Sequence, residues 1–153
     1  MTFSAPPGTR GARQPSGRAF RLLNRWVAQR IRRKGGKVMG FNALVLTTIG
    51  RKSGTERVTP LSWFPGEDGS FLIIASAAGA AHNPSWYHNI AANPDKVTVE
   101  IDGRTIAVTA DQLHGDEREE AWRRIAAAAP RFAAYQDKTD RQLPIIRLAP
   151  QPD

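Results

Sequence analysis

The sequence predicts a mainly β domain of the α+β class: a closed or half-closed antiparallel barrel of about six strands, with peripheral helices and a basic N-terminal helix. Short apolar, β-branched runs recur along the chain, tight turns separate them, and helical periodicity is confined to a few segments. With 153 residues, of which 41% are hydrophobic, the chain is expected to be one domain with a single packed core.

The chain is predicted to divide into three parts. Residues 1–17 contain three prolines, three glycines and almost nothing to bury, which is typical of a disordered basic tail. Residues 18–40 are predicted to be a basic amphipathic helix, which ends at Gly35 and Gly36, and a linker. Residues 41–150 are expected to form the barrel.

Six segments of the barrel have the apolar or alternating pattern of strands. They are residues 44–49, 58–64, 71–76, 97–101, 105–110 and 143–148. Residues 85–92 and 115–129 are predicted to be helices, and the acids in the first turn of the second helix complement its dipole. Residues 130–141 are expected to be irregular.

The N-terminal helix allows two interpretations. Phe20, Leu23, Val27 and Ile31 recur at helical spacing, with Trp26 beside them and arginines around this stripe. The stripe could pack on the barrel, or the helix could lie on an anionic membrane surface.

The net charge of +8 is unevenly distributed. Residues 1–60 hold 13 Lys and Arg against one acid, whereas residues 61–153 hold nine against 13 acids. This asymmetry indicates a basic arm on a near-neutral fold and argues against nucleic-acid binding by the folded domain. The chain has no cysteine, and His82, His88 and His114 show no metal-ligand spacing, so neither disulfides nor a metal site are expected. No run approaches the roughly 18 apolar residues of a membrane span.

The turn between the first two predicted strands has the composition of an anion site. Three cations, two hydroxyls and two glycines occur within eight residues: Arg51, Lys52 and Arg57; Ser53 and Thr55; Gly50 and Gly54. The glycines let the backbone turn tightly, and the fixed donors suit a phosphate or carboxylate. The spacing matches neither a Walker A loop nor a nucleophile elbow, so Ser53 is not expected to be a nucleophile. A solvated basic hairpin turn is the alternative interpretation.

Three separated motifs carry a family resemblance. LTTIGRKSGTERVTPL, ASAAGAAHNPSWYHNIAANP and AAYQDKTDRQLPIIRLAP occur in this order. Together they resemble the deazaflavin (F420)-dependent nitroreductase and quinone reductase family, over residues 35–150. The resemblance implies a split β-barrel of the flavin-reductase-like superfamily that binds coenzyme F420, whose tail carries a phosphodiester and polyglutamate. It also implies hydride transfer from the reduced deazaflavin to a quinone-like or nitro-aromatic acceptor.

By this resemblance, the basic turn would hold the anionic tail, residues 58–62 and 74–77 would border the deazaflavin ring, and the 85–92 helix would close the groove. The cofactor-binding residues that it implies are Arg51, Lys52, Ser53, Arg57, Val58, Thr59, Pro60, Leu61, Ser62, Ile74, Ala75, Ser76, Ala77, Trp86, Tyr87 and Asn89.

The resemblance also implies residues on the acceptor side. Ser76 and Tyr135 are expected to orient the acceptor by hydrogen-bonding an oxygen on which negative charge develops. Trp26, Phe132 and Tyr135 are expected to bind it.

The chain departs from the family pattern at several positions. Ala77 stands where the family often has a lysine, Ser62 where it often has a tyrosine, and Ala129 and Phe132 where it often has tyrosines. The coenzyme groove is therefore better supported than the acceptor pocket, and nitroreduction is less expected than quinone reduction.

Two alternatives stay open. One is an oxidoreductase of the same barrel type that binds flavin mononucleotide (FMN). The other is a non-catalytic membrane-surface or nucleic-acid binder that uses residues 1–40. The expected location is the cytoplasm, with peripheral contact to the inner membrane face if the N-terminal helix lies on lipid.

Overall fold

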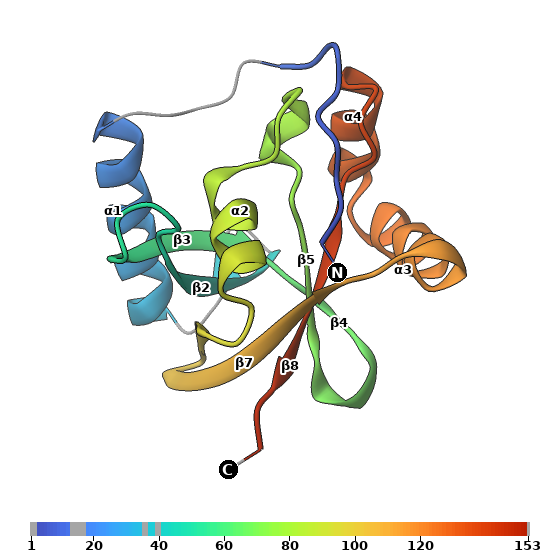
Figure 1. Cartoon of the computed structure of the whole chain (residues 1–153). Helices are drawn as coiled ribbons and strands as arrows, with labels where there is room; N and C mark the ends of the chain where they lie inside the picture. Colours follow the sequence, from blue (N-terminus) through green and yellow to red (C-terminus); the bar gives the residue numbers. More distant parts are fainter. Residues whose placement is uncertain (1–2, 13–17, 35–36, 39–40, 153) are drawn as a thin grey trace.

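The computed structural model describes residues 3–12, 18–34, 37–38 and 41–152. Its centre is a curled antiparallel sheet, around which four helices are placed (Figure 1). The strands are β1 (Lys37–Val38), β2 (Phe41–Ile49), β3 (Glu56–Ser62), β4 (Phe64–Pro65), β5 (Phe71–Ile74), β6 (Val97–Ile101), β7 (Arg104–Gln112) and β8 (Ile145–Pro150). The six predicted strands are confirmed, and the two further strands, β1 and β4, are two residues long.

The strand order is β1-β2-β6-β7-β8-β5-β4, with β3 paired to β2 outside this path. The sheet is thus a split barrel, and the predicted fold class is confirmed. Within the described residues β3 and β5 are not paired with each other, although residues of both line one cavity. The gap in the barrel is therefore where a site can form.

Strand alternation sets the main core. In β6, Val97, Val99 and Ile101 are buried while Thr98 and Glu100 between them are partly exposed, because successive side chains point to opposite faces. The inward side chains of the sheet meet in one cluster, which α2 (Ser85–Ala92) covers. The members of this cluster that are less than 1% exposed are Leu44, Leu46, Ile73, Ala75, Ile90, Val99, Val108, Ile146 and Leu148.

Two smaller clusters attach the other helices. Helix α3 (Gly115–Ala128) and helix α4 (Pro130–Lys138) pack on β5 and β8 around Ile125, Phe132 and Ile145. Helix α1 (Arg18–Lys34) packs on β2 through Ala28 and Ile31. Figure 1 shows α1 beside β2 and β3, with α3 and α4 on the other side of the sheet.

The prediction that residues 130–141 are irregular is wrong, because Pro130–Lys138 forms α4. Pro130 does not interrupt this segment. It occupies the first turn of α4 instead, where a missing N–H costs nothing and the fixed φ favours a helix.

The expectation of a disordered tail over residues 1–17 does not hold for residues 3–12, which lie along α4 and the loop after β5 (Figure 1). The Gly8 N–H donates to the Ala81 carbonyl at 2.8 Å, and the Ala12 N–H donates to the Gly79 carbonyl at 2.9 Å. Phe3 and Ala5 pack on the main core cluster, and backbone hydrogen bonds hold the segment at Gly8 and Ala12, so composition reveals little of this attachment. The rest of the predicted tail, residues 1–2 and 13–17, lies outside the described residues.

Within the described part of the chain, no helix is long and apolar enough to cross a bilayer. The same residues contain no group of three or more His, Cys, Asp or Glu side chains that could hold a metal ion.

Candidate functional site

A cavity of about 710 Å³ lies where four parts of the chain meet. One wall is the β2–β3 turn with β3, the second is the end of β5 with the 3₁₀ turn η2 (Ala77–Gly79), the third is the start of α2, and the fourth is α1. Its lining residues are Phe20, Arg21, Asn24, Arg25, Gly50, Arg51, Lys52, Ser53, Glu56, Arg57, Val58, Thr59, Pro60, Leu61, Ile74, Ser76, Ala77, Ala78, Pro84, Ser85, Trp86 and Asn89.

The β2–β3 turn is fixed by its own hydrogen bonds. The Gly50 N–H donates to the Thr55 carbonyl and the Gly54 N–H donates to the Gly50 carbonyl, each at 2.8 Å, and the Ser53 and Thr55 hydroxyls are 2.8 Å apart. Gly54 has φ +70°, a left-handed conformation that favours glycine. A Cβ at Gly50 would lie 2.5 Å from Ser53 Oγ, so a side chain there would displace the Ser53 hydroxyl from its present position. The turn therefore presents its cations from a defined backbone.

Asn89 joins this turn to α2. Its side chain is buried, its Oδ1 accepts from the Arg51 N–H at 3.1 Å, and its Nδ2 donates to Thr48 Oγ1 at 3.4 Å. One amide thus holds two cavity walls at a fixed separation.

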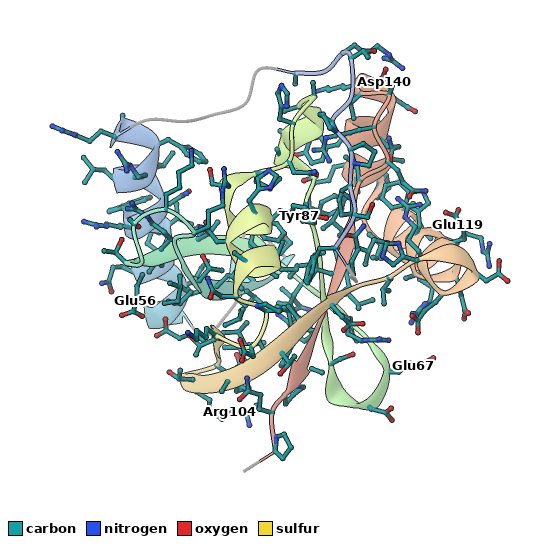
Figure 2. The ribbon with its side chains drawn as sticks, in the orientation of Figure 1. Glu56, Glu67, Tyr87, Arg104, Glu119 and Asp140 are labelled. Atoms are coloured by element: carbon teal, nitrogen blue, oxygen red, sulfur yellow. The ribbon has the colours of Figure 1, made fainter. Side chains whose placement is uncertain are left out.

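The lining is strongly positive. Arg21, Arg25, Arg51, Lys52 and Arg57 contribute five cations, against one carboxylate, that of Glu56. Figure 2 shows Glu56 near α1, in the region of β3. Several cations around one cavity favour an anionic ligand, because their mutual repulsion is relieved when it binds.

The pKa of the neighbouring His88 imidazole is also affected by the positive charge of this turn. Burial, then the charge of Arg51 and then that of His82 lower the pKa of His88 below its ordinary value. His88 is therefore held neutral at pH 7 and adds no cation beside Arg51.

The wall after β5 has an unusual backbone. Ala77 and Ala78 have φ values of 45° and 55°, in the left-handed region that non-glycine residues rarely adopt. The conformation costs about 1 kcal/mol or more at each alanine. It turns the chain sharply at the cavity, where Ser76, Ala77 and Ala78 line the wall.

The structure brings together 13 of the 16 cofactor-binding residues that the sequence predicts, and these 13 line the one cavity. The other three, Ser62, Ala75 and Tyr87, do not line it. Ser62 Oγ accepts from Arg131 Nη2 at 2.8 Å, and Ala75 is fully buried at the end of β5. The Tyr87 hydroxyl donates to Gln112 Oε1 at 2.6 Å, and burial raises the pKa of Tyr87. Figure 2 shows Tyr87 between α2 and the N-terminal segment.

Among the predicted acceptor residues, Ser76 lines the cavity, whereas the other three lie outside it. Trp26 is 57% exposed on α1 and stacks with the Arg30 guanidinium, which lies 4.9 Å from its ring centroid. Phe132 is buried on α4, with the rings of Phe64 and Tyr135 each 5.7 Å away. None of Trp26, Phe132 and Tyr135 lines the cavity.

The α1 wall was missed by the sequence reasoning. Phe20, Arg21, Asn24 and Arg25 line the cavity, whereas the sequence pattern placed the arginines only around the apolar stripe of the helix. Their spacing of one and four residues places them on one side of a helix. That spacing shows a shared face, but not that the face meets a turn some 30 residues further along the chain.

Comparison with protein families finds a match over most of the chain. Residues 20–150 match the family model described as F420H(2)-dependent quinone reductase. The chain belongs to this family. It is accordingly an oxidoreductase, and its cofactor is coenzyme F420.

Individual F420H(2)-dependent reductases agree with the match. An F420H(2)-dependent quinone reductase of Mycobacterium tuberculosis (strain H37Rv) is 35% identical over 109 residues, which cover 69% of this chain and 72% of the relative. The solved structure titled F420-H2 Dependent Reductase (FDR-A) is 39% identical, with a TM-score of 0.62, and covers 69% of this chain and 92% of that one. A protein of unknown function from Agrobacterium tumefaciens, Atu2129, shares the fold alone, at 19% identity and a TM-score of 0.58 over 92% of this chain and 60% of its own.

The chemistry of the cavity fits the cofactor. Its volume is in the range of pockets that hold small-molecule ligands. Cations lie on the β2–β3 wall, together with the Ser53 hydroxyl, and on the α1 wall, as an anionic tail requires. Val58, Pro60, Leu61, Ile74 and Trp86 supply apolar surface that suits a planar ring.

Proposed function

We propose that this cavity is the coenzyme site, and that the chain transfers a hydride from F420H(2) to a quinone-like or nitro-aromatic acceptor. The observation that carries the proposal is the convergence of five cations with the apolar ends of β3 and β5 around one cavity. The two kinds of surface match the two halves of a deazaflavin coenzyme, its anionic tail and its ring.

Each wall has a separate role in this proposal. Arg51, Lys52 and Arg57 bind the phosphate and glutamyl groups through charge-assisted hydrogen bonds. The backbone of β3 and the end of β5 border the ring, and Trp86 covers the groove from α2. The bound reduced coenzyme supplies the hydride.

The chain's contribution to the chemical step is proximity and orientation, because hydride transfer gains most from holding donor and acceptor in contact. Ser76 lies at the cavity wall, where its hydroxyl can donate to an acceptor oxygen as negative charge develops. Tyr135 approaches the other side of the same wall: a Cβ on Gly79 of η2 would lie 2.7 Å from the Tyr135 carbonyl oxygen.

A side-by-side titration of the purified chain with coenzyme F420 and with FMN tests the proposal. We expect micromolar or tighter binding of coenzyme F420 and weaker binding of FMN, because the turn offers more cations than one phosphate needs. Tighter binding of FMN would favour the FMN-binding oxidoreductase instead.

We propose, second, that the outward face of α1 contacts an anionic lipid surface. Leu22, Leu23 and Trp26 are 59%, 53% and 57% exposed and lie on one side of the helix, away from Ala28 and Ile31. The exposed Arg18 lies one turn before Leu22, and the exposed Arg30 lies one turn after Trp26, which gives this apolar face the cationic border that anionic headgroups attract. A lipid-dissolved quinone would then be close to the enzyme.

Vesicle sedimentation tests this second proposal with substitutions, since deleting α1 would remove a cavity wall. The wild-type chain is expected to sediment with vesicles that contain anionic lipid and to be released at high salt, since each basic residue near such a surface contributes about 1 kcal/mol. The double variant Leu22→Ser, Leu23→Ser is expected to lose most of this binding while its affinity for coenzyme F420 stays unchanged. A wild-type chain that ignores anionic vesicles would refute the proposal.

A further inference from the structure

Arg141 carries a charged side chain into the interior, where it is 3% exposed. It follows α4, and its backbone is held there: its N–H donates to Thr139 Oγ1 and its carbonyl accepts from Gln136 Nε2. Burial lowers the pKa of the Arg141 guanidinium from 12.5 to about 10, which still leaves it charged at neutral pH. A buried cation is costly unless it is fully hydrogen-bonded, so its partners indicate what it does.

Within the described residues, the guanidinium donates to four acceptors, and all four are uncharged. Its Nε donates to the Ala80 carbonyl at 2.7 Å, its Nη1 to the Ala75 carbonyl at 3.1 Å and to Asn83 Oδ1 at 2.7 Å, and its Nη2 to the Ser76 carbonyl at 2.9 Å. These acceptors lie within one nine-residue segment, residues 75–83, which leaves β5 and enters α2. The planar fork thus ties both ends of this segment to one point.

The same segment is the cavity wall that contains the left-handed alanines, Ala77 and Ala78. Such conformations persist only where the surroundings over-determine them. Arg141 itself does not line the cavity, yet it fixes the carbonyls on both sides of these two alanines. Its hydrogen bonds therefore bear directly on the shape of the wall.

The N-terminal segment holds the wall at further points. Asn83 uses both ends of its amide, because Oδ1 accepts from Arg141 while Nδ2 donates to the Ala5 carbonyl at 3.0 Å. The carbonyls of Gly79 and Ala81 accept from Ala12 and Gly8. The wall is thus held by Arg141 from within and by backbone contacts from residues 5–12.

We propose that Arg141 is a positioning residue of the coenzyme site. It holds residues 75–80 in the left-handed turn that sets Ser76, Ala77 and Ala78 against the coenzyme, so that affinity depends on a side chain that does not touch the ligand. The inference rests on the proposed function of the cavity. A lysine cannot replace this arginine, because one ammonium group cannot reproduce a fork that reaches four acceptors.

Arg118 offers a matched control. It is also a buried arginine, 5% exposed, and its Nη2 donates to the Leu143 carbonyl at 2.8 Å. Leu143 does not line the cavity, whereas Ser76, which accepts from Arg141, does. The test compares Arg141→Lys with Arg118→Lys in three measurements: the melting temperature, the Kd for coenzyme F420 by fluorescence titration, and amide hydrogen exchange at residues 77–81.

Both variants are expected to have a lower melting temperature than the wild type. Only Arg141→Lys is expected to exchange faster at residues 77–81 and to raise the Kd, by about tenfold, as the loss of one or two net hydrogen bonds would do. If the two variants bind coenzyme F420 equally well, the positioning role is refuted. If Arg141→Lys does not fold, Asn83→Ser decides: a Kd raised about threefold supports the role, and an unchanged Kd refutes it.

The wild-type titration separates this inference from the proposal beneath it. If the wild type does not bind coenzyme F420, the proposed function of the cavity fails. If the wild type binds and Arg51→Ala weakens binding while Arg141→Lys matches Arg118→Lys, only the positioning role fails.

Discussion

Arg51 and Lys52 in the β2–β3 turn, and Arg57 at the start of β3, differ in how far they are exposed to water. Arg51 and Lys52 are exposed, whereas Arg57, which is paired across to Thr48 in β2, is half-buried. An ionic contact is screened less when it is partly removed from water. The three residues should therefore contribute unequally and respond unequally to salt, even though the sequence presents them as one basic run.

Replacing each of these cations with alanine is expected to weaken binding of coenzyme F420 by about ten- to a hundredfold at low ionic strength, since a charge-assisted hydrogen bond is worth about 1.5–3 kcal/mol. Raising the salt concentration should reduce the loss in Arg51→Ala and Lys52→Ala more than in Arg57→Ala. Titrations at two salt concentrations measure this. Arg104→Ala is the control, because Arg104 is exposed at the start of β7, away from the β2–β3 turn (Figure 2). Unchanged affinity in all three variants would assign the turn to solvent.

Among the elements, the N-terminal segment has the least obvious attachment. The carboxylate of Asp140, just after α4, accepts from the Thr9 N–H at 2.7 Å, from the Arg10 N–H at 3.3 Å and from the Thr9 hydroxyl. Figure 2 shows Asp140 where this segment passes α4. The Thr9 hydrogen bonds, chiefly that of its hydroxyl, lower the pKa of Asp140 from 3.8 to about 2.

This lowered pKa predicts how attachment of the segment depends on pH. A carboxylate with a folded-state pKa below its ordinary value stabilises the bound segment fully above about pH 4 and loses that effect as the pH falls through about 2. The amide resonances of Thr9 and Arg10 should therefore keep their bound positions down to about pH 3 and shift below it. In Asp140→Asn they should be shifted at every pH, whereas Asp137→Asn, an exposed control on α4, should behave as the wild type. An ordinary Asp140 titration near 3.8 would contradict this.

At the scale of the whole molecule, the sequence predicts the strands and helices that have a local periodic pattern. It does not predict contacts between residues that are far apart along the chain. The period of two in β6 and the acidic start of α3 were sufficient to place those elements. The family resemblance then implied that the β2–β3 turn with β3, the end of β5 and α2 meet at one coenzyme, and residues of all of them line the cavity. Residues 3–12 and the α1 wall were missed, because backbone hydrogen bonds and helix docking leave no periodic signal. Arg141 was missed for the same reason, since its partners lie some 60 residues away.

The position of α1 couples coenzyme binding in the cavity to docking of this helix on the sheet. The helix supplies four lining residues to the cavity, yet its buried contacts with β2 include the small side chains of Ala28 and Ala43. The cavity is complete only when α1 is docked on the sheet, so the ligand binds only to the docked state. By mass action, a bound ligand therefore opposes detachment of the helix. Coenzyme F420 at a hundred times its Kd should stabilise the docked helix by about 2.7 kcal/mol. Trypsin should then cut at Arg18 and Arg30 up to about a hundredfold more slowly, while cutting at Arg104 stays unchanged. Equal rates with and without the coenzyme would show that α1 is held by the barrel alone; slower cutting would make the helix a reporter of how much of the enzyme is loaded.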